Sequence, residues 1–124
     1  MKKIVFICLC FLSFNLPVWA DAPVGDWICQ GNNPGDPRPY KGMVTVLKSG
    51  ETYTVLWRFG STTYIGTGLD LGDTFAISFT PAQKNDFVGL ALFKKKGNDW
   101  YGRWTLMGSK TAGAEVWKKN SLQK

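Results

Sequence analysis

Short runs of alternating apolar and polar residues, broken by turn-forming residues, constrain this chain more than any other feature. In Thr52–Phe59, for example, Tyr53, Val55, Trp57 and Phe59 alternate with more polar residues, and in a strand every second residue lies on the same face. No stretch of useful length has a helical period. Eight runs are predicted to be strands: Val24–Gln30, Tyr40–Lys48, Thr52–Phe59, Thr62–Leu69, Thr74–Thr80, Phe87–Lys94, Asp99–Leu106 and Ala114–Lys118.

The connections between these runs are typical of hairpins. KSGE (48–51), FGS (59–61), LGD (71–73) and KGND (96–99) are short and carry glycine with Asn, Asp or Ser, so consecutive strands should pair antiparallel. GNNPGDPR (31–38) is a longer loop. We expect an all-β fold: a single domain over residues 21–124, an antiparallel meander of about eight strands, closed or nearly closed into a barrel. Closure removes unpaired strand edges. A two-layer β-sandwich is the alternative.

An aromatic residue stands two positions before a glycine at four places within or beside these runs: Tyr40/Gly42, Tyr64/Gly66, Phe87/Gly89 and Trp100/Gly102. Glycine inside a strand permits the sharp coiling or the bulge that a small barrel needs. A neighbouring aromatic ring can cover the backbone that glycine leaves bare. We therefore interpret the repeated step as a curvature device. The functional alternative is that these glycines make room for a ligand or a partner.

The N-terminus is typical of a secretory signal peptide. Met1-Lys2-Lys3 is followed by an apolar run of about 11 residues, too short for the roughly 20 residues of a membrane-spanning helix. We expect cleavage between Ala20 and Asp21, and export to the periplasm or the exterior. Removal of residues 1–20 from 124 leaves 104 residues, and the loss of Lys2 and Lys3 lowers the formal charge from +6 to +4. No later segment is expected to cross a membrane.

The composition argues against several kinds of function. There is no histidine, the commonest general base and metal ligand, and Cys29 would be the single cysteine of the mature chain. Neither enzyme activity, nor a metal site, nor a cofactor is expected. Cys29 itself is expected to be a buried packing residue. The run Lys94–Lys96 is interpreted as a solvated turn, so that a nucleic-acid partner is not expected either.

Two interpretations of the barrel interior remain open. Aromatic residues at alternate positions could simply fill it, because an eight-stranded barrel is only wide enough for side chains or one small ligand. Alternatively, they could line a cup for a small apolar or ring-shaped molecule. The candidate ligand-binding residues are Trp27, Tyr53, Trp57, Trp100 and Trp104. The charged residues Arg58, Arg103 and Glu115 are expected to face solvent, since an inward charge would need a partner.

Several motifs resemble those of a family of small exported bacterial proteins, some of them labelled fibronectin-binding proteins. The resemblance rests on GNNP (31–34), YKGMVTV (40–46), GETYTVLW (50–57), YIGTG (64–68), GD (72–73), GRWTLMG (102–108) and EVW (115–117). GDW (25–27) is similar to the Gly-x-Trp sequence that opens lipocalin and avidin-like barrels. The resemblance implies a calycin-like barrel and, through the family label, binding to a host-matrix protein. No biotin site is implied, because a set of polar ligand residues like that of avidin is missing.

These observations favour a non-enzymatic, exported interaction module whose protein partner is unknown. The candidate contacts are Asn32, Asn33, Asp36 and Arg38 in the long loop, with Ser49 and Tyr53. The last two belong to SGETY (49–53), which is similar to a signature of periplasmic lysozyme inhibitors, although a basic protein matches a cationic lysozyme poorly. The alternative from a different class is a calycin-like carrier of a small apolar molecule.

Overall fold

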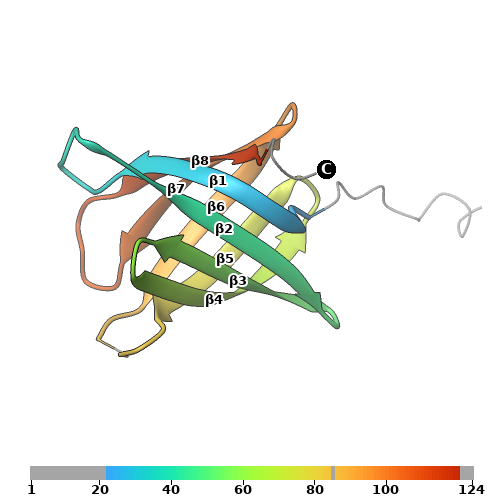
Figure 1. The fold of residues 1–124 in the computed structure, drawn as a ribbon, viewed down its shortest axis with the longest axis horizontal. Coiled ribbons are helices and arrows are strands. Elements are labelled where there is room, and N and C mark those ends of the chain that lie inside the picture. Colours follow the sequence, from blue (N-terminus) through green and yellow to red (C-terminus); the bar gives the residue numbers. More distant parts are fainter. Residues whose placement is uncertain (1–21, 85, 121–124) are drawn as a thin grey trace, which may run out of the picture.

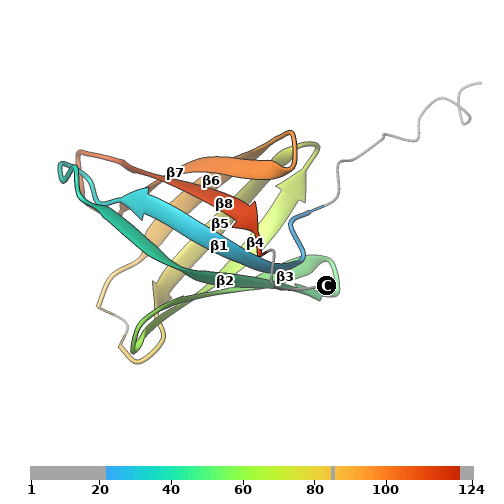
Figure 2. The same cartoon turned by 45° about the horizontal axis from the view of Figure 1, so that its top comes forward.

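The computed structural model describes residues 22–84 and 86–120. Within them the chain forms eight strands and no helix. Each strand pairs antiparallel with the next, and β8 pairs with β1 to close the barrel (Figures 1 and 2). The strands are β1 (Gly25–Asn32), β2 (Pro39–Ser49), β3 (Thr52–Phe59), β4 (Thr62–Leu71), β5 (Thr74–Pro81), β6 (Gly89–Lys96), β7 (Asp99–Leu106) and β8 (Gly113–Lys119).

The expected all-β meander is thus confirmed, and the sandwich alternative is wrong because the sheet closes on itself. The strand boundaries lie within two residues of the prediction. The predicted signal peptide and the expected cleavage site between Ala20 and Asp21 lie outside the described residues. In the described part of the chain no helix is long and apolar enough to cross a membrane.

Four connections are two-residue hairpins that begin with glycine: residues 50–51, 60–61, 72–73 and 97–98. Gly50 and Gly72, with φ of 65° and 62°, are in the left-handed region, whereas no non-glycine residue that the structure describes has a positive φ. A hairpin turn whose first central residue alone has positive φ is a type II′ turn, which matches the twist of the flanking strands. The predicted hairpins therefore form because of where their glycines stand.

Connections alternate between the two ends of a meander, so the barrel has two different ends. At the turn end lie the hairpins 50–51, 72–73 and 97–98. At the loop end lie the hairpin 60–61 and the three long connections 33–38, 82–88 and 107–112. Backbone hydrogen bonds join the long connections to one another or to a strand of the barrel. For example, the Met107 N–H donates to the Val88 carbonyl at 2.8 Å. The loop end therefore has a defined rim.

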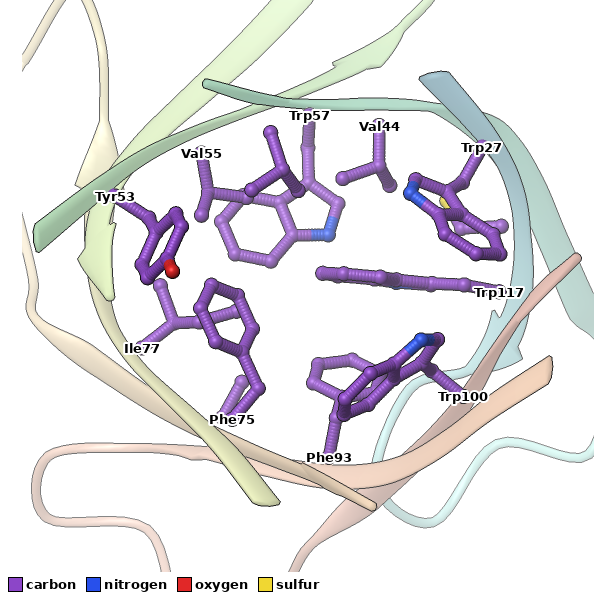
Figure 3. Close-up of a cluster of buried hydrophobic side chains, with 13 residues drawn as sticks. Trp27, Val44, Tyr53, Val55, Trp57, Phe75, Ile77, Phe93, Trp100 and Trp117 are labelled. Atoms are coloured by element: carbon purple, nitrogen blue, oxygen red, sulfur yellow. The ribbon is translucent and has the colours of Figure 1, made fainter. Parts of the chain in front are cut away.

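The interior is densely packed toward the turn end (Figure 3). Trp117 lies edge-on in the middle, among rings that reach inward from several strands. Trp117 and Phe93 stack with centroids 4.2 Å apart. The turn end is closed by the segment before β1, where Pro23 is fully buried and its carbonyl accepts the Trp27 indole N–H at 2.8 Å. The buried hydrophobic residues are Trp27, Cys29, Val44, Val46, Tyr53, Val55, Trp57, Phe75, Ile77, Ala91, Phe93, Trp100 and Trp117.

Aromatic rings cover several of the strand glycines, each ring coming from the neighbouring strand, whereas at Gly66 the nearest side-chain atoms are Ile77 Cγ2 and Phe79 Cβ. A Cβ at Gly42 would lie 2.4 Å from a Phe59 ring carbon, and one at Gly89 would lie 2.2 Å from a Phe79 ring carbon. Phe79 is the direct cross-strand partner of Gly89, and the register of β2 with β3 places Phe59 opposite Gly42; side chains directly opposite in an antiparallel pair are close enough to interact. The aromatic residue two positions earlier, which the sequence motif suggested, is not the covering ring at these positions. The glycines let rings lie flat against the wall.

Candidate functional site

Five aromatic side chains form a closed ring at the loop end, which we call the aromatic collar. Its members are Tyr40, Phe59, Tyr64, Phe79 and Trp104, from β2, β3, β4, β5 and β7. Going round from Tyr40 and back to it, adjacent centroids are 5.3, 6.0, 6.3, 6.4 and 6.4 Å apart. The planes of all five pairs are steeply inclined, in the edge-to-face arrangement that aromatic rings prefer. Each ring of the collar is therefore held in place by contacts with the two rings next to it.

A cavity of about 460 Å³ lies within the collar and reaches below it. Its size is in the usual range for sites that hold small molecules. Phe87, in the connection 82–88, adds a ring at the rim, with its centroid 6.2 Å from that of Tyr64. The lining residues are Asn33, Tyr40, Lys41, Trp57, Phe59, Thr62, Tyr64, Phe79, Phe87, Ala91, Phe93, Trp104, Leu106 and Glu115. The barrel is thus filled at the turn end and forms an aromatic cup at the loop end.

Glu115 is a buried carboxylate in the lining of this cup. It is 7% exposed, so the expectation that it faces solvent was wrong. Strand alternation explains this result: Glu115 and Trp117 share one face of β8, and Trp117 points into the core. Arg58 and Arg103 are exposed, as expected.

Three neutral donors hold the Glu115 carboxylate in place of a cation. The Tyr40 hydroxyl donates to Oε1 at 2.5 Å. The indole N–H groups of Trp57 and Trp117 donate to Oε2 at 2.9 and 2.6 Å. Buried charges need hydrogen-bonded partners, and this set supplies them from three different strands. The carboxylate thereby connects the packed half of the interior with the collar.

The pKa values around Glu115 follow from burial. Loss of solvent raises the pKa of Glu115, against the opposing effect of the hydrogen bonds from Tyr40, Trp117 and Trp57. Burial, followed by the negative charge of Glu115, strongly raises the pKa of Tyr40 and of Cys29. Both groups are therefore neutral at ordinary pH. Cys29 is a fully buried free thiol.

Trp104 presents an indole N–H that has no hydrogen-bond partner although it is buried. It lies close enough to Tyr40 to lower the pKa of that phenol slightly, but outside hydrogen-bond geometry. Buried polar groups usually have partners, and an exception calls for an explanation. The nitrogen lies against β8, where a Cβ at Gly113 would be 2.7 Å from Nε1, so this donor is enclosed by the barrel wall.

The five predicted ligand-binding residues divide between the two halves of the barrel. Trp57 and Trp104 line the cup, whereas Trp27, Tyr53 and Trp100 belong to the packed half, each of them buried. Their part in ligand binding stays a prediction. Sequence reasoning did not single out Tyr40, Phe59, Tyr64, Phe79 or Glu115 as cup residues. Strand alternation could have identified two of them, because Phe59 shares a face with the inward-facing Trp57, and Glu115 shares a face with the inward-facing Trp117.

The predicted partner-contact residues lie at opposite ends of the barrel. Asn32, Asn33, Asp36 and Arg38 are at the loop end, where Arg38 Nη2 pairs with Asp36 Oδ2 at 3.0 Å and Asn32 Nδ2 donates to the Asp36 carbonyl. Ser49 is exposed at the turn end. Tyr53 points inward, is 6% exposed and donates its hydroxyl to Asp70. A surface that includes both SGETY and the long loop therefore cannot be continuous, and the SGETY tyrosine is not a surface residue.

Neither a known protein-family model nor a curated protein sequence matches the chain. Solved structures do. A secretory abundant heat soluble protein from Ramazzottius varieornatus aligns with a TM-score of 0.50 and 12% identity, over 84% of this chain and 100% of that one. Secretory abundant heat soluble protein 4 from the same organism aligns with a TM-score of 0.51 and 14% identity, over 84% and 99%. These likenesses concern the fold alone.

Proposed function

We propose that this protein is a non-enzymatic binding barrel that holds a small, largely apolar molecule in the aromatic cup at its loop end. The cavity within the aromatic collar carries this proposal: about 460 Å³, reached from the end of the barrel where the long connections lie. Apolar ligand sites typically combine such a cavity with a few polar groups that orient the ligand. Among the lining residues, Glu115 and Tyr40 supply such polar groups.

The division of the interior supports the same function. A barrel whose only task was stability would gain from filling both halves, because each buried methylene contributes about 0.8 kcal/mol. Here the rings of the collar brace one another around a cavity while the turn half is closely packed. We further propose that the barrel acts after export, on the basis of the predicted signal peptide.

The test measures binding of a neutral aromatic probe, 1-naphthylmethanol, by calorimetry and by quenching of tryptophan fluorescence. Native mass spectrometry of the purified protein detects any molecule that co-purifies with it. A matched pair of variants on β6 identifies the site. Ala91 is buried in the cup lining, and the adjacent Leu92 points outward and is 53% exposed. Ala91→Met should fill the cup and weaken binding about tenfold or more, whereas Leu92→Met should leave it unchanged. Equal effects, or no saturable binding to folded protein, would contradict the proposal.

A second candidate function, binding of a protein partner, is favoured by a different observation. Apolar residues are exposed on the outer face of β4 and β6, among them Ile65, Leu69, Leu90 and Leu92. Across the intervening β5, Leu69 and Leu92 flank Ala76 in one row of the sheet. Scattered exposed apolar residues are ordinary, but a contiguous group is typical of an interaction surface. Fibronectin, the partner that the family resemblance implies, is the first protein to test. Immobilised fibronectin should retain the protein and lose it on Leu90→Lys if this candidate is correct.

A further inference from the structure

The buried charged group in the cup is acidic. Among residues 22–84 and 86–120, Glu115 is the one charged side chain that is buried. The nearest basic contribution to the lining is Lys41, whose side chain is at the rim and exposed. A ligand in the cup therefore meets an acidic group with no buried cation beside it, and a cationic ligand would favour its ionised form against the burial that raises the pKa of Glu115. This chemistry differs from that of a site built to receive an anion, which would place a buried basic group at this depth.

The hydrogen bonds of Glu115 leave room for one more donor. Oε2 accepts two indole N–H groups, whereas Oε1 accepts the Tyr40 hydroxyl alone. A carboxylate has about four acceptor positions in all, so that Oε1 keeps a position for a donor from the cavity. The three existing donors are neutral, and they orient the carboxylate without balancing its charge.

The collar adds a second preference for positive charge. Aromatic faces attract cations within about 6 Å of the ring centroid, and more strongly where the site excludes water. Tyr40, Tyr64 and Trp104 are among the rings that surround the cavity. A carboxylate together with a ring of aromatic side chains is complementary to an ammonium group carried on an apolar body.

From this geometry we infer that the cup selects organic cations: molecules with an aromatic or alkyl body and one amine or ammonium group that pairs with Glu115 inside the collar. This inference rests on the proposed function and specifies its ligand class. The apolar body occupies the cavity, and the N–H groups of the ammonium reach Oε1 of Glu115. Carboxylate ligands are excluded because two like charges would be buried together.

Three probes that share one naphthyl ring test the inference at pH 7.5 by calorimetry on the intact protein: 1-naphthylmethylamine, which is cationic, 1-naphthylmethanol, which is neutral, and 1-naphthylacetate, which is anionic. We expect the amine to bind at least about tenfold more tightly than the alcohol, and the acetate to bind more weakly than either. Similar affinities for amine and alcohol would overturn the inference while leaving the cup a binding site. Failure of all three to bind would overturn both.

Glu115→Gln provides the matched variant, because glutamine keeps an oxygen acceptor of similar size and removes the charge. It should bring the amine-to-alcohol affinity ratio close to one. Glu51→Gln, an exposed residue of the hairpin 50–51 at the opposite end, is the control and should leave the ratio unchanged. If Glu115→Gln fails to fold, the comparison of the three probes on the wild-type protein still decides the question. An unchanged ratio in folded Glu115→Gln would overturn the inference.

Discussion

Trp57 donates its indole N–H to Oε2 of Glu115 at 2.9 Å, across the inside of the barrel. Trp57 is on β3 and Glu115 on β8, and these strands are not neighbours in the sheet. The contact is therefore independent of the ladder hydrogen bonds that close the wall. Because Trp117 donates to the same oxygen, the carboxylate fixes two large rings relative to each other. Glu115, which lines the cup, thus also links β3 and β8 through these hydrogen bonds.

Removing this tie should destabilise the protein markedly. Glu115→Leu keeps the volume roughly constant but leaves the donors of Tyr40, Trp57 and Trp117 without an acceptor. Each buried donor left unsatisfied costs about 1–3 kcal/mol, and we expect the free energy of unfolding to fall by roughly 2–5 kcal/mol in urea titrations. Glu51→Leu, at an exposed turn position, should change it by less than about 0.5 kcal/mol. Equal stability of the two variants would mean that the three bonds contribute little.

Stability should also depend on pH through Glu115. Its pKa is raised by burial above the ordinary value of 4.5, so the folded protein binds more protons than the unfolded chain between that value and the raised pKa. The free energy of unfolding should therefore decrease as the pH rises through this window. Tyr40 and Cys29, which face Glu115 from β2 and β1, have raised pKa values and remain neutral there.

The measurement for this effect is the difference in unfolding free energy between wild type and Glu115→Gln from pH 4 to pH 8. Glutamine does not titrate, so other groups cancel in the difference. We expect the wild type to lose stability relative to the variant as the pH rises. A flat difference, or one of opposite sign, would show that the donors outweigh burial and that the pKa of Glu115 is not raised.

The fold could be predicted from sequence because the strand signals are local. Alternation marks each strand, and a glycine at the first position of a two-residue connection specifies the hairpin at Gly50 and at Gly72. With eight such strands in about one hundred residues, the need to remove unpaired edges favours closure. The remaining ambiguity between barrel and sandwich depends on pairing of β1 with β8, which is a long-range contact that no local pattern encodes.

The cup was harder to predict because it depends on position along the barrel axis. Trp100 and Trp104 share one face of β7, yet Trp100 is buried in the packed half and Trp104 lines the cup. Alternation determines which side of the wall a residue faces; it does not say which end of the barrel is filled. The inward direction of Glu115 could have been read from Trp117, but the three donors that make this burial tolerable come from β2, β3 and β8 and meet only in the folded chain.

The glycines that lie beneath rings should be coupled energetically to those rings. Gly89 is the clearest case, since the three atoms nearest to a Cβ at this position all belong to the Phe79 side chain, between 2.2 and 2.6 Å away. Gly89→Ala should therefore cost about 1–3 kcal/mol through overpacking. In Phe79→Leu the smaller side chain should admit the methyl group, so that the double variant is more stable than the sum of the two single effects predicts. Additive effects in urea titrations of the four proteins would contradict the covering role of Phe79.

Cys29 should be chemically inert while the barrel is folded. Its side chain is fully buried, and burial, followed by the charge of Glu115, raises the pKa of the thiol, whereas the thiolate is the reactive form. At pH 8 we expect N-ethylmaleimide to modify Cys29 only through unfolding, at a rate that increases when the protein is destabilised by Glu115→Leu. Peptide mass analysis separates Cys29 from Cys8 and Cys10. Ser49→Cys, at an exposed position, provides the reference for fast labelling. If Cys29 in native protein were labelled at a similar rate, the core around Cys29 would open locally without global unfolding.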